Sequence, residues 1–351
     1  MGVLVSYNKL RRIITIALIT FSVLGLWRIY INYYLTSQWT TPCLNCFIHD
    51  KAPMTTASST VNVSADGIWT INSLGRLGNQ MGEYATLLAL AKMNGRQAYI
   101  LAKMYNILAP LFKITLPVLP DAVDKNIKWR TYHVSSRMSD EYKHIEGQYV
   151  KFTGYPASYT FFFDIKDEIH NEFMFHNAIR EEAYGSLLKL KGQRQNATYI
   201  GVHIRRGDYA AYMSRRWNGV IAGKGYVEKA IGYFRKKYPE PVFVVVSNDM
   251  QWCKKNIDAS RGDVYFSGDG IESSPERDFA LLCHCNHSIM TLGTFGIWSS
   301  YLAGGETIYL TNFSLPGPDA KPFPYDRLYR PDWIGFPADL SPILPTIPSS
   351  V

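Results

Sequence analysis

Residues 199–209 read YIGVHIRRGDY, an apolar stretch that runs directly into two arginines, a glycine and an aspartate. Tyr199–Ile204 has the length and composition of a β-strand. Charged residues that follow such a strand lie at the carboxyl edge of its sheet, where open α/β sheets bind their ligands. The stretch therefore predicts a fold class and the position of a site.

Strands and helices alternate on both sides of this stretch. Val242–Val246 is an unbroken β-branched run, typical of a strand that is covered on both faces. Ser273 and Glu276 have the spacing of a capping box at a helix start. The other expected elements are strands at Ile68–Ile71, Gln97–Leu101, Val264–Phe266, Ser288–Thr291 and Thr307–Leu310, and helices at Met81–Met93, Tyr226–Tyr238, Gln251–Ile257 and Ile297–Ala303. Two such β-α-β series predict an α/β chain with two Rossmann-type, doubly wound domains that face each other across a cleft.

Three loops at expected strand ends have the composition of an anion site. Residues 75–80 (GRLGNQ) and 291–297 (TLGTFGI) place glycines before a helix start, where backbone N–H groups bind phosphate. Arg205 and Arg206 suit phosphate oxygens through their planar guanidinium groups. Asp208 would be a carboxylate beside this fixed positive charge, acting as a general base or only orienting Arg205. The alternatives are a plain tight turn for the first loop and a surface salt-bridge cluster for the arginines.

Metal-binding motifs are missing from the sequence. It contains no Asp-x-Asp motif, and no set of ligand residues surrounds His284 and His287 at metal-binding spacing. Arginines and helix N-termini would then have to stabilise a leaving diphosphate. Asp278, on the helix expected after Ser273, would bind a base or ribose, or support the helix start. We expect no metal and no cofactor.

The excess positive charge is concentrated near the N-terminus. The chain has 37 Lys and Arg against 29 Asp and Glu, a net charge of +8 that alone would suggest a nucleic-acid binder. Half of this excess comes from the only cations that precede Asp50, namely Lys9, Arg11, Arg12 and Arg28. Beyond them the charges nearly balance, so we expect no nucleic-acid partner.

An uncharged apolar run, Ile13–Trp27, lies between these cations. Together with Ile29–Ile31 it would span about 28 Å as a helix, close to a hydrocarbon core of about 30 Å. The basic cluster precedes the run, so the positive-inside rule places the N-terminus in the cytoplasm. A cleaved signal peptide is the alternative, but no small-residue cleavage site follows Trp27. We expect a single-pass type II protein of the early secretory pathway.

The segment after the expected anchor is polar. Residues 36–66 hold ten Ser and Thr among 31 residues, which is typical of a flexible stalk. In an oxidising lumen, Cys43 and Cys46 would form a stem disulfide, within one chain or between two chains of a homodimer. N-glycosylation sequons stand at Asn62, Asn196, Asn286 and Asn312; Asn62 is the favoured site, and Asn286 would be inaccessible beside its strand.

Motifs between Gly67 and Leu340 resemble the galactoside α-1,2-fucosyltransferases, glycosyltransferase family 11. The matching segments are WTIN (69–72), GRLGNQMGEYAT (75–86), FTGYP (152–156), HIRRGDY (203–209), GDGIE (268–272), DFALL (278–282) and GTFGIW (293–298). The resemblance implies a GT-B-like fold in a type II Golgi membrane protein. It also implies transfer of fucose from GDP-β-L-fucose to O2 of a terminal β-galactose on glycoproteins or glycolipids, forming Fucα1-2Gal with inversion and without a metal ion.

The same resemblance implies roles for the site residues. The arginine loop resembles the donor-binding loop of α1,2-, α1,6- and protein O-fucosyltransferases. Arg205 would hold the β-phosphate, and Arg205 and Asp208 are the expected catalytic pair. The donor-binding set is His203 and Asp278 for guanine, Arg206 for support of the loop, Thr294, Phe295 and Gly296 for the diphosphate and fucose, and Asn79 from the opposite domain.

These expectations divide the chain into six parts. They are a cytoplasmic tail at 1–12, a transmembrane anchor at 13–31, a lumenal stem at 32–66, an acceptor-side domain at 67–195, a GDP-fucose-binding domain at 196–315 and a Pro-rich surface wrap at 316–351. Two other functions remain open. One is a protein O-fucosyltransferase, against which the motifs at 75–86 and 152–156 argue. The other is a non-catalytic lumenal glycan-binding protein.

Overall fold

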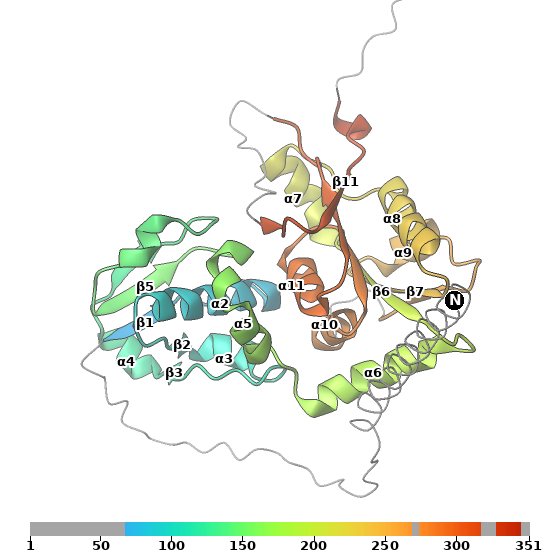
Figure 1. Ribbon diagram of the computed structural model, residues 1–351. Helices are drawn as coiled ribbons and strands as arrows, with labels where there is room; N and C mark the ends of the chain where they lie inside the picture. Colours follow the sequence, from blue (N-terminus) through green and yellow to red (C-terminus); the bar gives the residue numbers. More distant parts are fainter. Residues whose placement is uncertain (1–66, 269–273, 317–327, 345–351) are drawn as a thin grey trace, which may run out of the picture. The chain divides into compact units, whose positions relative to one another are not determined.

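The computed structural model describes residues 67–268, 274–316 and 328–344. These residues fall within one compact unit, residues 62–351. No helix in the described ranges is long and apolar enough to cross a membrane. The expected anchor, the stem with Cys43 and Cys46, and the sequon at Asn62 lie outside those ranges. Two groups of parallel strands organise the described chain, here termed the N-terminal lobe (β1 to α5) and the C-terminal lobe (α6 to β11) (Figure 1).

The C-terminal lobe is built on a six-stranded parallel sheet in the order β11-β10-β9-β6-β7-β8. The strands are β6 (Thr198–Ile204), β7 (Pro241–Ser247), β8 (Val264–Phe266), β9 (His287–Met290), β10 (Thr307–Thr311) and β11 (Ile334–Pro337). The chain moves outward from β6 to β8 on one side, then returns to β9 and moves outward to β11 on the other. This is the strand order of dinucleotide-binding folds, whose switch point between β6 and β9 opens a crevice for a ligand.

The helices of this lobe pack on the two faces of the sheet. They are α6 (Asn177–Lys191), α7 (Gly207–Trp217), α8 (Lys224–Lys237), α9 (Met250–Asn256), α10 (Pro275–Cys283) and α11 (Thr294–Ala303). In α8, buried side chains recur from Tyr226 to Phe234 on one face, and the last turn is basic. The strands β6 and β7 are apolar throughout because helices cover both of their faces.

The N-terminal lobe has a smaller parallel sheet. Its strands are β1 (Ile68–Ile71), β2 (Ile100–Leu101), β3 (Val118–Leu119), β4 (Arg130–His133) and β5 (Tyr149–Thr153), and its helices are α2 (Leu77–Met93), α3 (Ala102–Leu108), α4 (Asp121–Asn126) and α5 (Lys166–Glu172). β5 lies between β1 and β4, and β2 pairs with β3. A parallel bridge between Trp69 and Ala98 joins the two groups. In α2, 13 of 17 residues are buried, so this helix packs on nearly every side.

The α/β architecture with parallel sheets agrees with the sequence prediction, and three local features differ from it. The segment 207–217 forms helix α7, which the polar sequence RRGD did not suggest. The N-cap of α10 is Ser274, and its side chain makes no capping hydrogen bond, so the expected capping box is wrong. Part of the expected C-terminal wrap, Ile334–Pro337, forms β11 and extends the sheet beside β10.

Candidate active site

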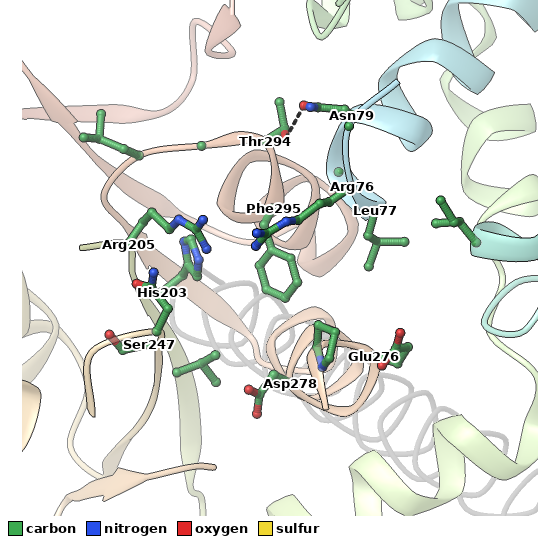
Figure 2. A pocket seen from close by; sticks show the side chains of 18 of the residues that line it. Arg76, Leu77, Asn79, His203, Arg205, Ser247, Glu276, Asp278, Thr294 and Phe295 are labelled. Carbon is green, nitrogen blue, oxygen red and sulfur yellow. Dashed lines mark hydrogen bonds between the residues drawn. The ribbon is translucent and has the colours of Figure 1, made fainter. Parts of the chain in front are cut away.

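A pocket with a volume of 660 Å³ opens at the switch point of the C-terminal sheet. Both lobes line it: residues 75–79 and parts of α3 from one, and the ends of β6, β7 and β9 from the other. Figure 2 shows Arg205 and His203 on one side of the space and Arg76 and Asn79 on the other. The pocket contains seven of the nine predicted catalytic and donor-binding residues: Asn79, His203, Arg205, Asp208, Asp278, Thr294 and Phe295. Arg206 and Gly296 do not line it.

Arg205 is held in place at the end of β6. Its backbone N–H donates to Thr291 Oγ1 at 2.9 Å, which ties the β6 end to the β9 end across the switch point. Its guanidinium donates to the Asp208 carboxylate at 2.9 Å and lies 5.4 Å from the Tyr209 ring centroid. The Arg205 side chain is 19% exposed and that of Asp208 is 59% exposed. A half-desolvated, oriented guanidinium of this kind suits a phosphate oxygen.

Arg206 points away from the pocket contacts and braces the loop. Its guanidinium donates to the carbonyl of Ala222 at 2.7 Å and stacks 3.9 Å from the Trp252 ring centroid. Its backbone N–H donates to Asn248 Oδ1 at 2.9 Å. Burial lowers the pKa of Arg206, although Asp249 lies within ion-pair distance. The placement agrees with a supporting role and not with direct donor contact.

His203 is buried in the wall of the pocket as a neutral ring. Burial, with the charge of Arg205 as a second cause, lowers its pKa to about 3. Its Nδ1 has no hydrogen-bond partner among the described residues. A Cβ at Gly296 would stand 2.6 Å from that nitrogen, so Gly296 makes room for the imidazole. Phe295 packs against the same ring, with centroids 5.2 Å apart.

The two lobes touch where α2 and α11 begin. Thr294 Oγ1 donates to Asn79 Oδ1 at 2.8 Å, a contact drawn in Figure 2. A Cβ at Gly78 would lie 2.6 Å from the Thr294 carbonyl carbon. The sequence interpretation of this glycine, backbone access for an anion, is therefore wrong: Gly78 permits two helices to approach closely. The start of α11 has no side-chain cap, so its first N–H groups remain oriented for an anion.

Asp278 lies on α10 at the far end of the pocket. Its carboxylate accepts from Ser267 Oγ at 3.5 Å, and Gly268 lies against it. Among the residues that the structure describes, three carboxylates line the pocket: Asp208, Glu276 and Asp278. Asp208 is the one bonded to Arg205, whereas the other two stand on the first turn of α10.

The family model described as glycosyl transferase family 11 matches residues 44–337. The chain belongs to glycosyl transferase family 11. Its curated relatives include galactoside alpha-(1,2)-fucosyltransferase 2 of Rattus norvegicus, 57% identical over 281 residues that cover 79% of each protein. The Sus scrofa protein of the same name is 55% identical, covering 82% of this chain and 86% of its own. Galactoside alpha-(1,2)-fucosyltransferase 1 of Oryctolagus cuniculus is 51% identical, covering 83% and 80%.

Likenesses to solved structures are more distant. A mutant of Arabidopsis thaliana FUT1 in complex with GDP superposes with a TM-score of 0.48 at 12% identity, covering 74% of each chain. POFUT1 in complex with GDP gives 0.46 at 12% identity, covering 77% of this chain and 98% of its own. The family assignment therefore rests on the sequence relatives.

The structure adds pocket residues that sequence reasoning missed in this family 11 chain. Arg76, at the N-cap of α2, points into the pocket from the N-terminal lobe (Figure 2). Tyr209 on α7 packs under Arg205, and Ser247 and Asn248 follow β7. The last two could have been found, because they follow an apolar strand as Arg205 does. Arg76 and Tyr209 stood inside the quoted motifs without a role.

Three of the four sequons lie among the described residues. Asn196, Asn286 and Asn312 are all exposed, so the expected burial of Asn286 is wrong. The Asn286 side-chain oxygen nevertheless accepts from the Tyr199 backbone N–H at 2.8 Å. Glycosylation of the four asparagines stays a prediction. In the described part of this family 11 chain, no group of three or more His, Cys, Asp or Glu side chains could hold a metal ion.

Proposed function

We propose that this chain transfers L-fucose from GDP-β-L-fucose to the 2-hydroxyl of a terminal β-galactose, forming Fucα1-2Gal on glycoproteins or glycolipids. The observation that carries the proposal is 51–57% identity, over about four fifths of each chain, to proteins named galactoside alpha-(1,2)-fucosyltransferases. The pocket supports it, because an arginine and an uncapped helix start meet at a sheet switch point that the opposite lobe also lines.

The donor would bind with its diphosphate between Arg205 and the start of α11. As the bond between the fucose anomeric carbon and the β-phosphate oxygen breaks, negative charge grows on that oxygen. Arg205 and the α11 N–H groups stand where they can stabilise this charge without a metal ion. Guanine would lie beside His203 and Asp278, and Thr294, Phe295 and Asn79 would line the fucose and diphosphate. We place the chain in a GT-B-like arrangement on this basis.

The acceptor would attack the anomeric carbon from the face opposite the diphosphate, which inverts the configuration. The galactose O2 forms the new bond and loses its proton. Asp208 is our candidate base because it lies beside the proposed phosphate clamp. Its ion pair with Arg205 also suits the second role, in which Asp208 only orients the guanidinium.

A transfer assay with linkage analysis tests the function. GDP-fucose is offered with a β-galactoside, the matching 2-deoxygalactoside and a folded protein domain, each with and without EDTA. We expect Fucα1-2Gal from the galactoside alone, at the same rate with EDTA. Transfer to the protein domain would assign the chain to protein O-fucosylation. Binding of the galactoside without transfer would make it a glycan-binding protein.

Arg205→Ala tests the donor site within that function. Removing one charge-assisted contact to the leaving group should lower turnover by about 10²–10³ and also weaken GDP binding. Steady-state kinetics and calorimetric titration with GDP measure both effects. A variant with wild-type turnover and wild-type GDP affinity would overturn the donor assignment.

For the cellular setting we propose a type II Golgi membrane protein with its catalytic lobes in the lumen. The support is the basic cluster before the apolar run at 13–31 and the polar stalk at 32–66. A homodimer joined through the stem is part of the same proposal. Protease protection in sealed Golgi vesicles tests the topology, and non-reducing electrophoresis of Cys43→Ser tests the dimer.

A further inference from the structure

The loop between β1 and α2, residues 72–76, is held from below by a buried carboxylate. Glu83 on α2 is fully buried. Its Oε1 accepts from Asn72 Nδ2 at 2.5 Å, and its Oε2 accepts from the Leu74 backbone N–H at 3.0 Å. The same Asn72 Nδ2 donates to the Gly154 carbonyl at 3.1 Å, so one carboxylate connects the ends of β1 and β5.

Two further side chains fix the same loop. Gln80, also fully buried, accepts from Ser73 Oγ at 2.8 Å and donates to the Leu74 carbonyl at 2.9 Å. Lys103 Nζ on α3 donates to the Ser73 carbonyl at 3.0 Å. The loop therefore has partners on both its N–H and its carbonyl groups, and Glu83 is the only acidic residue among them.

The fixed loop leads directly into the pocket. Gly75 has φ +71°, and a Cβ there would stand 2.1 Å from Asn79 Nδ2, so the loop backbone packs on the Asn79 amide. Asn79 in turn accepts from Thr294 at the start of α11. A shift of Leu74 would displace Gly75, and with it the amide that the N-terminal lobe presents to the pocket.

We propose that Glu83 is a positioning residue for fucosyl transfer: it holds the β1–α2 loop so that Asn79 meets Thr294 and the donor in the reactive geometry. This rests on the proposed function. Burial is the largest influence on this carboxyl and raises its pKa to about 8, against the opposing effects of the Leu74 N–H, Lys103 and Asn72. An apolar side chain would fill the same space without this desolvation, but it would leave the Leu74 N–H without a partner.

A double-mutant cycle between Glu83→Gln and Asn79→Ala tests the proposal. Glutamine keeps the shape but turns one acceptor into a donor, which faces either Asn72 Nδ2 or the Leu74 N–H. We expect Glu83→Gln to lower kcat by between tenfold and about a hundredfold, the scale of a misplaced group remote from the chemistry. GDP affinity should stay within about twofold of wild type, because the proposed GDP contacts come mainly from the C-terminal lobe. In the Asn79→Ala background, Glu83→Gln should cost less than about twofold more, since the group that it positions is already gone.

Glu172→Gln is the matched control. Glu172 is a carboxylate of the same lobe that accepts from the Thr115 N–H at 2.7 Å and from the Tyr84 hydroxyl at 2.5 Å, and it does not line the pocket. Its loss should lower the melting temperature without changing kcat. Lys103→Met, an exposed position that loosens the same loop, is the second variant if Glu83→Gln does not fold. Its loss of kcat should likewise vanish in the Asn79→Ala background.

The outcomes separate the two levels of proposal. A wild-type chain without fucosyl transfer defeats the proposed function itself. An active wild type in which Glu83→Gln keeps full kcat, or loses the same factor with and without Asn79, defeats the positioning role. Equal losses of kcat in Glu83→Gln and Glu172→Gln at matched melting temperature would reduce Glu83 to a general stabilising residue.

Discussion

Asp208 accepts a hydrogen bond from Arg205 and is more than half exposed, so two roles meet at one side chain. Asparagine separates them, because its Oδ1 can still accept from Arg205 while its amide cannot take a proton. We expect Asp208→Asn to lower kcat by about 10²–10⁴, the range of general-base catalysis, with GDP affinity within about twofold of wild type. Full turnover would leave Asp208 as an orienting residue, and a loss of GDP affinity would point to Arg205 instead.

His203 makes the fold sensitive to acid. Its pKa is lowered to about 3 in the folded chain, against an ordinary value of 6.5. Below pH 6.5 the unfolded chain therefore binds a proton that the folded chain rejects, and stability falls progressively as the pH falls toward 3. Between pH 7 and 5 this amounts to about 2 kcal/mol.

Denaturant unfolding at pH 7 and pH 5 measures this contribution. His203→Asn should lose less stability than wild type over that interval, whereas His144→Asn, at an exposed histidine, should behave as wild type. Bound GDP should reduce the acid sensitivity if the nucleotide contacts the neutral ring. An equal loss in wild type and His203→Asn would mean that His203 is not buried as a neutral group.

At the scale of elements, the N-terminal turns of α2 and α11 decide how the two lobes meet. Gly78 leaves no space for a methyl group against Thr294, with 2.6 Å to its carbonyl carbon. Gly78→Ala should lower the free energy of unfolding by about 1–3 kcal/mol, and it should lower fucosyl transfer by separating Asn79 from Thr294. Thermal melts and the transfer assay measure the two effects.

The control for this substitution is another glycine within a helix. A Cβ at Gly232 on α8 would have no neighbouring atom within 4 Å, so alanine fits there freely. Gly232→Ala should raise stability by about 0.5–1 kcal/mol and leave transfer unchanged. If Gly78→Ala behaved in the same way as Gly232→Ala, the close approach of α2 and α11 would not be a constraint.

The elements also show what the sequence could predict. Buried strands such as β7 were predicted within a residue or two, because β-branched runs between turns have few other structures. The placement of Arg205 followed from the carboxyl-edge rule once its strand was recognised. α7 was missed because its polar first turn has no apolar period. Arg76 was missed because its position depends on how α2 meets α11, a contact between residues more than 200 apart in sequence.

At the scale of the whole molecule, one hydrophobic core joins the two lobes. The cluster that contains β1, α2 and β5 side chains continues through Phe173 and Phe162 to Trp298 of α11 and Phe279 of α10. Phe162 stacks on Trp298 with centroids 5.2 Å apart, and Phe173 meets the same indole edge-on at 5.1 Å. A separate cluster fills the opposite face of the C-terminal sheet. The lobes thus share apolar surface instead of each closing its own core.

Shared burial predicts cooperative unfolding. Phe173→Ala removes a fully buried ring of the N-terminal lobe and should cost about 3–5 kcal/mol. Because Trp298 loses its partner, we expect the C-terminal lobe to lose stability too, so that calorimetry shows one transition shifted as a whole. The calorimetric and van't Hoff enthalpies should then agree in wild type and variant. Two transitions, of which only one moves with Phe173→Ala while GDP shifts only the other, would show that the lobes unfold independently. In that case the contact between Asn79 and Thr294 would be a docking contact between separate domains, and the loop held by Glu83 would have to be positioned anew with each closure of the pocket.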